Sequence, residues 1–469
     1  MAFSSVQFIF VFLPLALGVY HVLPRRTRNV VLCAFSFLFF AWAGLRGALL
    51  LAGLAALNWA GGLVLGRTAH KKRWLALLVA ADLAVLALFK YAGFAAESVN
   101  ALFPGLLPVL RPALPLGISF YLFTSIGYCA DVAAGRVQPA RNPLRFFLFL
   151  AFFGHGPSGP IVRYGQQLPQ LDPCAEARRV TLDRFCYGIK RLVFGLAKKA
   201  IIADQLALIY QRVTSVPAST LPAPILLLGY AAFMLQLYFD FSGYSDMAIG
   251  IGAFFGLELP ENFNYPYLAR SVGEYWRRWH ISLSSWFRDY VYIPLGGSRR
   301  GTARTCRNLL IVFVLTGLWH GAAWQYVVFG LAHGLILCAE RLGLRSLLEK
   351  LPALFQHLYA LVMIYLTLIM FGAPGVKEGF AALAGIFRWQ KGAPGYTLTA
   401  FADGKLLLIL LLGALLCGPV QAALPRLREA LWSKKAPGIA MMFWLLVLLF
   451  LGLMRITAGT YSAFIYFQF

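Results

Sequence analysis

The sequence has few charged residues for its length. Of its 469 residues, 13% are charged and 60% are hydrophobic. A soluble domain has about 25% charged residues, so this chain has too little polar surface for a soluble fold of its size. Its composition excludes secreted, disordered, fibrous and ordinary cytosolic proteins, and the lack of alternating ten-residue strands argues against an outer-membrane barrel. The sequence therefore predicts an all-α polytopic membrane protein.

Acidic residues and paired cysteines are also scarce. The 18 Asp and Glu face 42 Lys and Arg, which gives a net charge of +24. The basic residues form short clusters between apolar stretches, a pattern typical of cytoplasmic loops rather than of nucleic-acid binding. Such clusters favour lipid headgroups or phosphate-bearing ligands. The seven cysteines form no C-x-x-C pair, so we expect no disulfide framework, no metal site and no bound cofactor.

Basic loops indicate the order of the membrane segments. Segment 6–23 precedes a basic loop at 24–29, and a second basic loop at 67–73 follows two more apolar segments. The rule that cytoplasmic loops are positive predicts that both loops, and a later one at 424–436, are cytoplasmic. The remaining apolar segments are 30–44, 46–66, 74–96, 116–135, 144–162, 222–256, 356–373, 405–423 and 438–457.

We expect one integral membrane domain over residues 1–469, with about ten to twelve transmembrane and re-entrant helices. The motif-bearing core covers about 115–340, and peripheral spans cover 1–114 and 341–469. Residues 101–115 hold four prolines and should not form a helix. Residues 308–340 are longer than the roughly 20 residues that one crossing needs, and arginines flank both ends. A re-entrant helical hairpin fits that pattern, with His320 deep in the membrane.

Two basic stretches are predicted to lie at the membrane surface. Residues 178–199 carry seven basic residues among apolar ones, as an amphipathic segment at the inner surface does. Residues 274–307 place Trp276, Trp279 and Trp286 at helical spacing. We interpret this stretch as an interfacial helix whose tryptophans anchor it and whose arginines contact lipids or donor phosphates.

Ionisable residues within apolar segments are candidates for function. His320 is the strongest candidate, because a neutral imidazole accepts a proton from a hydroxyl near physiological pH; a structural histidine is the alternative. Asp240 and Asp246 could orient the site or form a structural network. Asp82 and Lys90 could be functional, a buried pair or interfacial. The chain has no G-x-S-x-G, Walker or H-E-x-x-H motif, so hydrolase-triad, ATPase and zinc-protease mechanisms lack support.

Six sequence words occur in order along the middle of the chain. They are LPLGISFY at 114–121, GPIVRY at 159–164, YFDFSGYSDMAIG at 238–250, PENFNYPY at 260–267, EYWRRWHISLSSWFRDYVYIPLGG at 274–297 and GLWHGAAW at 317–324. With these words the sequence resembles the membrane-bound O-acyltransferase family, in its alginate O-acetylation branch. Residues 154–160 depart from the family pattern, which leaves the channel lining and the acceptor open.

The resemblance implies a ring of helices around a central channel in the cell inner membrane. It implies transfer of an acyl group, expected to be acetyl, from a cytoplasmic thioester such as acetyl-CoA toward an exopolysaccharide, with periplasmic SGNH-type acetyltransferase partners. The family's essential histidine corresponds to His320, the expected general base, and its second motif histidine to His280. Further candidates for donor or channel contacts are Arg277, Arg278, Arg288, Asp240, Tyr244, Asp246 and Trp319.

Two alternative functions remain open at this point. The same fold could transfer D-alanine or another acyl group to teichoic acid, peptidoglycan or cellulose. A transporter or flippase without chemistry is the alternative of another class. Inverted repeats with matched broken helices would favour a transporter, and the sequence contains no such repeat.

Overall fold

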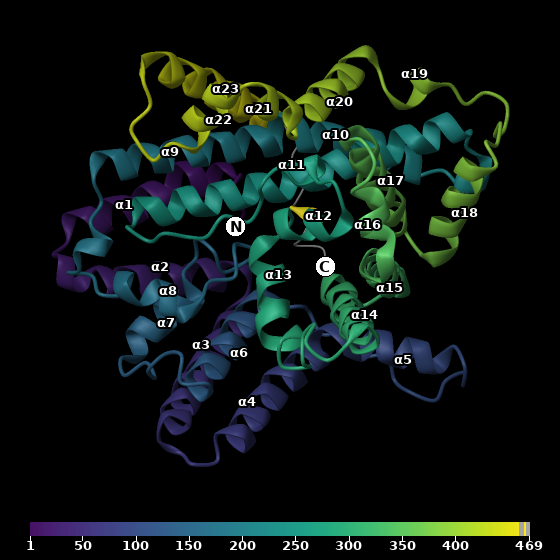
Figure 1. Ribbon diagram of the computed structural model, residues 1–469. Coiled ribbons are helices and arrows are strands. Elements are labelled where there is room, and N and C mark those ends of the chain that lie inside the picture. The colour runs from purple at the N-terminus through teal and green to yellow at the C-terminus, as the bar shows by residue number, and fades with distance from the viewer. Residues whose placement is uncertain (459–463, 466–469) are drawn as a thin grey trace.

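A computed structural model describes residues 1–458 and 464–465, and all regular structure within these residues is helical (Figure 1). The centre of the molecule is α11 (Ala223–Phe254), a 32-residue helix buried along most of its length. Its sequence is apolar on every side, which is typical of a helix surrounded by protein. Helices α9 (Leu182–Ala197) and α10 (Asp204–Thr214) pack along it.

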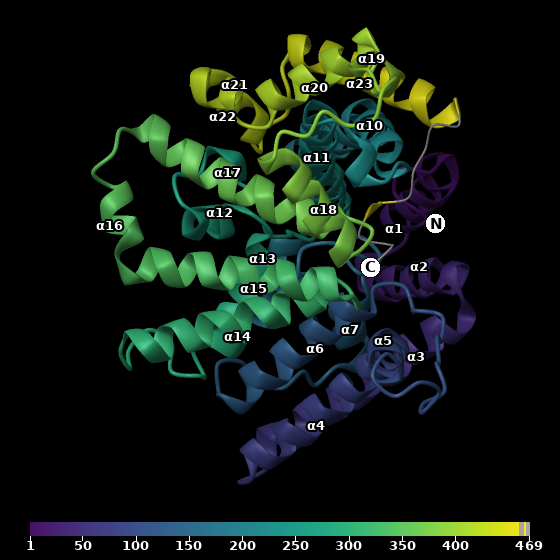
Figure 2. The same ribbon diagram turned by 90° about the vertical axis from the view of Figure 1, so that its right-hand side faces the viewer.

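The N-terminal third forms one side of the molecule. Helix α6 (Ile118–Ala133) is almost fully buried, and α3 (Leu45–Arg67) and α4 (Lys71–Leu86) pack against it. This group lies at the bottom of Figure 2. The other helices here are α1 (Leu13–Val22), α2 (Arg28–Ala43), α5 (Ala92–Asn100), α7 (Pro143–Ala151) and α8 (Tyr164–Gln167).

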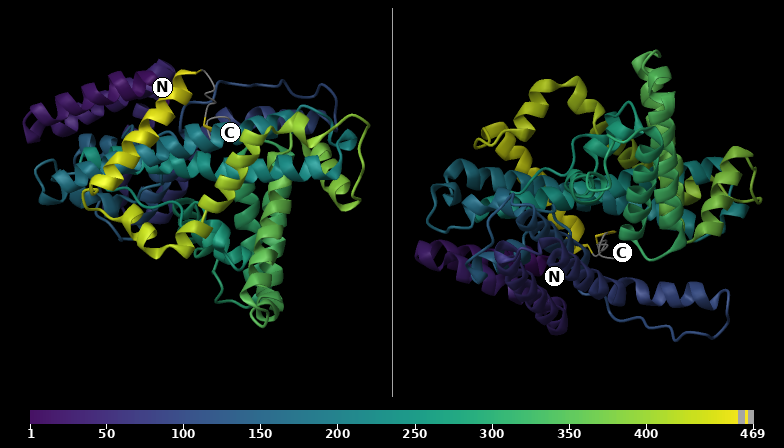
Figure 3. Two further views of the ribbon diagram at one scale, coloured as in Figure 1. Left: turned by 90° about the horizontal axis from the view of Figure 1, so that it is seen from above. Right: turned by 60° about the horizontal axis from the view of Figure 1, so that its bottom comes forward.

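The C-terminal helices cover the central helix on the opposite side. Seen from above, α23 (Ile439–Thr457) crosses over the central helices (Figure 3), and it contacts α9. Helix α20 (Gly404–Leu416) contacts α10. The remaining C-terminal helices are α16 (Arg345–Leu348), α17 (Ala353–Gly372), α18 (Val376–Phe387), α19 (Leu398–Phe401), α21 (Pro419–Ala423) and α22 (Pro425–Trp432).

Six helical stretches among the described residues are long and apolar enough to cross a membrane. They are Leu45–Arg67, Lys71–Asn100, Ala223–Phe254, Trp324–Leu348, Ala353–Gly372 and Ile439–Thr457, and shorter apolar helices cover Phe8–Val22, Ile118–Ala133 and Gly404–Leu416. The chain is therefore a multi-pass membrane protein. Two predicted segments are not continuous helices: in 144–162 the helix α7 ends at Ala151, and 405–423 breaks between α20 and α21. Glycines and prolines end both helices.

Residues 178–199 pack inside the protein more than a segment that lies on the membrane surface would, while their position near the inner surface stays a prediction. Helix α9 lies between α11 and α23, and Lys190, Arg191 and Lys199 are all buried. Carboxylates on neighbouring segments pair with Arg191 and Lys199, and two main-chain carbonyls accept from Lys190. Ion pairs and hydrogen bonds of this kind make buried charge tolerable, so a basic amphipathic pattern here marks an internal helix.

The prediction of one interfacial helix in 274–307 is wrong. The chain forms two short helices, α12 (Val272–Arg278) and α13 (Ile281–Phe287), and breaks at His280. The three tryptophans are buried, and Trp286 stacks on Phe123 of α6 with ring centroids 4.0 Å apart. The aromatic face therefore packs into the protein core and not into the membrane interface.

Residues 308–340 form the expected pair of helices. Helix α14 (Thr302–His320) packs against α15 (Trp324–Ala339), and the chain between them breaks at 321–323. A Cβ atom on Gly317 would meet the Tyr326 carbonyl, and one on Gly330 would meet the Phe313 carbonyl. These two glycines allow the helices to approach closely enough to form the hairpin.

Candidate active site

The two motif histidines are 40 residues apart in the sequence, and both pack against the ring of Trp319. The Trp319 ring centroid is 5.5 Å from that of His280 and 5.0 Å from that of His320. All three side chains are buried. The structure thus brings together His280, Trp319 and His320, which we call the histidine cluster.

The end of α14 fixes the position of His320. The last carbonyls of a helix lack partners within the helix and carry its negative dipole end. Lys90 donates to the Trp319 carbonyl, and Tyr91 donates to the Leu318 carbonyl at 2.8 Å. A cation and a hydroxyl from the helical stretch Lys71–Asn100 therefore cap the helix that carries His320. Lys90 is therefore hydrogen-bonded within the protein and does not form the buried pair with Asp82 that the sequence allowed. Asp82 instead accepts a hydrogen bond from Asn58.

Backbone pairing between two motif words fixes the position of His280. The Ile281 N–H donates to the Asn262 carbonyl, and the Asn264 N–H donates to the Arg278 carbonyl. His280 lies between these two bonds with φ 44°, in the left-handed region. Such a conformation is costly outside glycine and persists only where neighbouring contacts impose it. The Phe241 ring packs edge-on against the imidazole at 4.7 Å.

One cavity opens beside His320. It has a volume of about 560 Å³ and is lined by the chain after His320, by the α5 region and by residues 110–114. We call it the turn cavity. Its wall contains Lys90, the aromatic residues Phe89, Phe94 and Tyr326, and the Glu97–Arg111 ion pair. It is a polar and aromatic space next to the turn that follows His320.

A second cavity, of about 590 Å³, lies between the central helices and the C-terminal helices. We call it the α9–α11 cavity. Its lining is mainly apolar and comes from α9, α11, α20, α22 and α23. Asn262 also lines it, and the Asn262 Oδ1 atom is 3.2 Å from His280 Nδ1. Asn262 thus lines this cavity and also contacts His280, which is not itself part of the lining.

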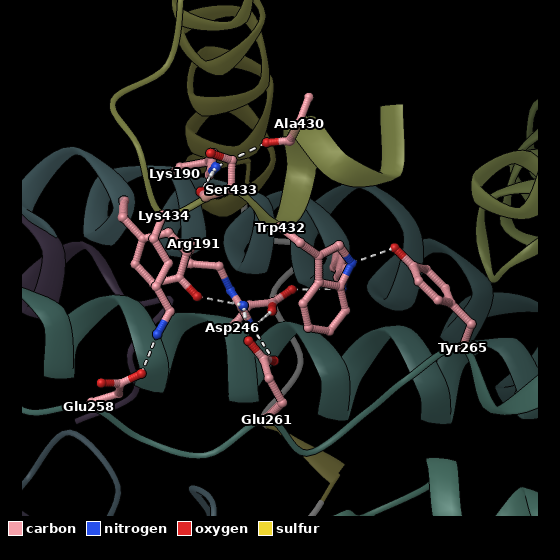
Figure 4. Close-up of polar contacts among 12 residues, drawn as sticks. Lys190, Arg191, Asp246, Glu258, Glu261, Tyr265, Ala430, Trp432, Ser433 and Lys434 are labelled. Atoms are coloured by element: carbon pink, nitrogen blue, oxygen red, sulfur yellow. Dashed lines mark hydrogen bonds and ion pairs between the residues drawn. The ribbon is translucent and has the colours of Figure 1, made fainter. Parts of the chain in front are cut away.

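The two aspartates of α11 belong to ion networks. Asp246 pairs with Arg191 and with Lys198 at 2.6 Å, and Glu261 also pairs with Arg191 (Figure 4). Asp240 pairs with Lys199 at 2.6 Å, and Lys199 pairs with Asp204 at 2.8 Å. The structure therefore shows the ion network, and because Asp246 also lines the α9–α11 cavity, a role of these aspartates in the site stays a prediction. Tyr244 is likewise packed away, against Phe3 and Phe464.

Two of the three candidate arginines pair with neighbouring carboxylates, and the third is exposed. Arg278 pairs with Glu274 at 2.7 Å, Arg288 pairs with Asp289 at 2.8 Å, and Arg277 is exposed. Burial raises the pKa of Glu274, but hydrogen bonds from the Arg270 N–H and from Arg278 outweigh it and hold that pKa below its ordinary value. Glu274 is thus an anion that keeps Arg278 in place.

Sequence reasoning missed Asn262, and it singled out Lys90 without identifying its partner. Asn262 lies within PENFNYPY, but nothing in that word alone indicates a contact with His280. Lys90 carried a signal, a cation within an apolar segment, but its partner is 229 residues away. In the part of the chain that the structure describes, no group of three or more His, Cys, Asp or Glu could hold a metal ion.

Comparisons with known proteins identify the family of the chain. The sequence profile of the membrane-bound O-acyltransferase family matches residues 139–377. The probable alginate O-acetylase AlgI of Pseudomonas putida is 38% identical over 493 residues, covering all of both chains. The peptidoglycan O-acetyltransferase of Helicobacter pylori is 34% identical, covering 82% of this chain and 79% of its own.

A relative with lower identity is named for the transfer of D-alanine rather than acetyl. The teichoic acid D-alanyltransferase of Bacillus subtilis is 30% identical over 233 residues, covering 47% of this chain and 58% of its own. The family profile spans both histidine words, and the full-length similarity extends to the flanking helices. The chain belongs to the membrane-bound O-acyltransferase family and is an integral membrane O-acyltransferase.

Proposed function

We propose that the protein O-acetylates a cell-surface polysaccharide from the inner membrane, with a cytoplasmic thioester such as acetyl-CoA as donor. The full-length similarity to a probable alginate O-acetylase supports acetyl as the group and a polysaccharide as the acceptor. The observation that carries the proposal is the histidine cluster itself, in which His280 and His320 both pack against Trp319. One cavity is lined by the residues that follow His320, and another is lined by Asn262, the partner of His280.

The cavities suit substrates that arrive from opposite faces of the membrane. The turn cavity is lined by residues 110–114 of the proline-rich segment 101–115, which in this proposal lies on the outer side. The α9–α11 cavity adjoins α22, which lies in the basic loop predicted to be cytoplasmic. The apolar α9–α11 cavity would admit the donor's acyl arm, and the polar turn cavity would admit a hydroxyl acceptor.

The chemistry needs one proton acceptor at the meeting point. The acceptor oxygen forms a bond to the thioester carbonyl carbon, and the carbon–sulfur bond breaks. In our proposal His320 takes the hydroxyl proton as general base and returns it to the leaving thiol. His280 positions or polarises the donor, and arginines such as Arg277 attract its phosphates. Periplasmic SGNH-type acetyltransferases would then carry the acetyl group to the exopolysaccharide.

The test is acetyl-ester content of the surface polysaccharide in a deletion strain. Wild type should restore it, and His320→Ala at matched protein level should lower it about 100-fold or more, because general acid–base catalysis contributes about 10²–10⁴-fold. His70→Ala, at an exposed histidine, is the control and should restore it fully. Full restoration by His320→Ala would refute the proposed base.

The acceptor has one specific rival, because a relative that this chain matches over 82% of its length is named a peptidoglycan O-acetyltransferase. Acetyl ester on purified peptidoglycan should be measured in the same strains. If only that pool falls on deletion, the polysaccharide is the wrong acceptor although the chemistry stands. If deletion lowers only D-alanine esters, both the proposed acceptor and the proposed acetyl group are wrong.

A further inference from the structure

Asn262 is a fully buried amide whose orientation is fixed by its neighbours. Its Oδ1 atom accepts from the Ser282 backbone N–H at 3.1 Å and from the Ser282 hydroxyl at 2.9 Å. The Ile161 N–H donates to that hydroxyl oxygen at 3.0 Å, which leaves the hydroxyl hydrogen for Asn262. A backbone N–H only donates, so the atom that faces it must be the amide oxygen and not the amide nitrogen.

The same oxygen determines which nitrogen of His280 carries the proton. His280 Nδ1 lies 3.2 Å from Asn262 Oδ1. An amide oxygen only accepts, so Nδ1 must be the donor and must carry a hydrogen. In a neutral imidazole the lone pair is then on Nε2. Because the ring is buried among Phe120, Phe241 and Trp319, no bulk water competes for this bond.

We propose that Asn262 is a positioning residue that holds His280 as the Nδ1–H tautomer, so that Nε2 acts as a hydrogen-bond or proton acceptor. The catalytic consequence rests on the proposed function. A ring in this state has no hydrogen on Nε2 to donate to a thioester carbonyl. Of the two roles given to His280, it therefore positions the donor by accepting from one of its N–H or O–H groups and does not polarise the carbonyl.

The backbone of Asn262 supports the same geometry. Its carbonyl accepts from the Ile281 N–H at 3.0 Å, directly after the left-handed His280. The main chain of Asn262 thus holds the backbone next to His280, and its side chain determines the tautomer of the His280 ring. Other residue types of similar size lack this combination: leucine has no acceptor, and aspartate adds a charge.

The first test reads the tautomer directly by ¹⁵N solid-state NMR of histidine-labelled protein in lipid bilayers. His280→Asn assigns the His280 signals among the seven histidines. We expect a protonated Nδ1 and an unprotonated Nε2 in the wild type. Asn262→Leu should produce a mixture of tautomers, and Asn262→Asp should shift the Nδ1 signal because a carboxylate accepts more strongly.

Three results would overturn the proposal. They are an Nε2–H tautomer in the wild type, an unchanged tautomer in Asn262→Leu, and an unmoved Nδ1 signal in Asn262→Asp. If Asn262→Leu does not fold, the wild-type and aspartate spectra decide the question alone. None of these spectra requires substrate, so they separate the proposal about Asn262 from the proposed function.

The second test measures turnover with acetyl-CoA. For a folded Asn262→Leu protein we expect kcat/KM for acetyl-CoA to fall about 10-fold, mainly through a higher KM, because the ring can no longer accept the donor's hydrogen bond in most molecules. An unchanged kcat/KM would contradict a positioning role. If the tautomer is as expected but wild type transfers no acetyl group, the proposed function fails and the assignment of the His280 tautomer stands.

Discussion

Lys90 shows how a single residue makes a charge tolerable within an apolar segment. Its ammonium group donates to the Trp319 carbonyl and lies 5.9 Å from the centroid of the Trp319 ring. Tyr91 completes the cap on α14 through the Leu318 carbonyl. Because these carbonyls immediately precede His320, the cap sets both the end of the helix and the position of the proposed base.

Removing either hydrogen bond that caps α14 should lower the free energy of unfolding by the strength of that bond. We expect Tyr91→Phe to cost about 1 kcal/mol and Lys90→Met about 1.5–3 kcal/mol, because bonds from charged donors are stronger. Thermal unfolding in one fixed lipid mixture would rank them, with His70→Ala as the control. Equal midpoints for Lys90→Met and wild type would show that the carbonyl needs no cap.

At the scale of elements, α22 and the residues after it close the α9–α11 cavity. Lys190 donates to the Ser433 carbonyl at 2.5 Å and to the Ala430 carbonyl at 3.1 Å. Trp432 donates to the Tyr265 hydroxyl at 2.8 Å, and Lys434 pairs with Glu258. Figure 4 shows these contacts converging beside the Arg191–Asp246 pair. The segment is therefore held by polar bonds from several helices.

Loss of Lys190 should release this segment. A hydrogen bond from a charged donor contributes about 1.5–3 kcal/mol, so Lys190→Ala should raise the open population about 10- to 100-fold. Tryptic cleavage after Lys434 should accelerate by a similar factor, while Lys405→Ala, at an exposed site on α20, should cleave as wild type. Unchanged cleavage would mean that the other contacts hold the segment alone.

Much of the element pattern was predictable, and the failures share one cause. The hairpin of α14 and α15 followed from the length of an apolar stretch and the arginines around it. The burial of α9 did not, because the carboxylates that pair with its cations lie on other segments. The break at His280 depends on pairing with residues 262–264. Hydrophobic periodicity reports on neighbours three or four residues away, and these partners are much farther along the chain.

At the scale of the whole molecule, the two cavities should open on opposite sides of the membrane. A membrane-impermeant maleimide should label Leu106→Cys, an exposed residue of the proline-rich loop, in intact spheroplasts. Native Cys174, which is exposed, should react only after the membrane is opened. Labelling of both positions from one side would contradict the two-sided arrangement.

The cap on α14 also constrains how the enzyme is assembled during synthesis. Lys90 and Tyr91 leave the ribosome more than 220 residues before the carbonyls that they bind. The early part of the chain must therefore remain in the bilayer with a buried cation still lacking its final partner. The catalytic geometry is completed only when the late hairpin arrives, so nascent chains that stop before it should be inactive and prone to degradation.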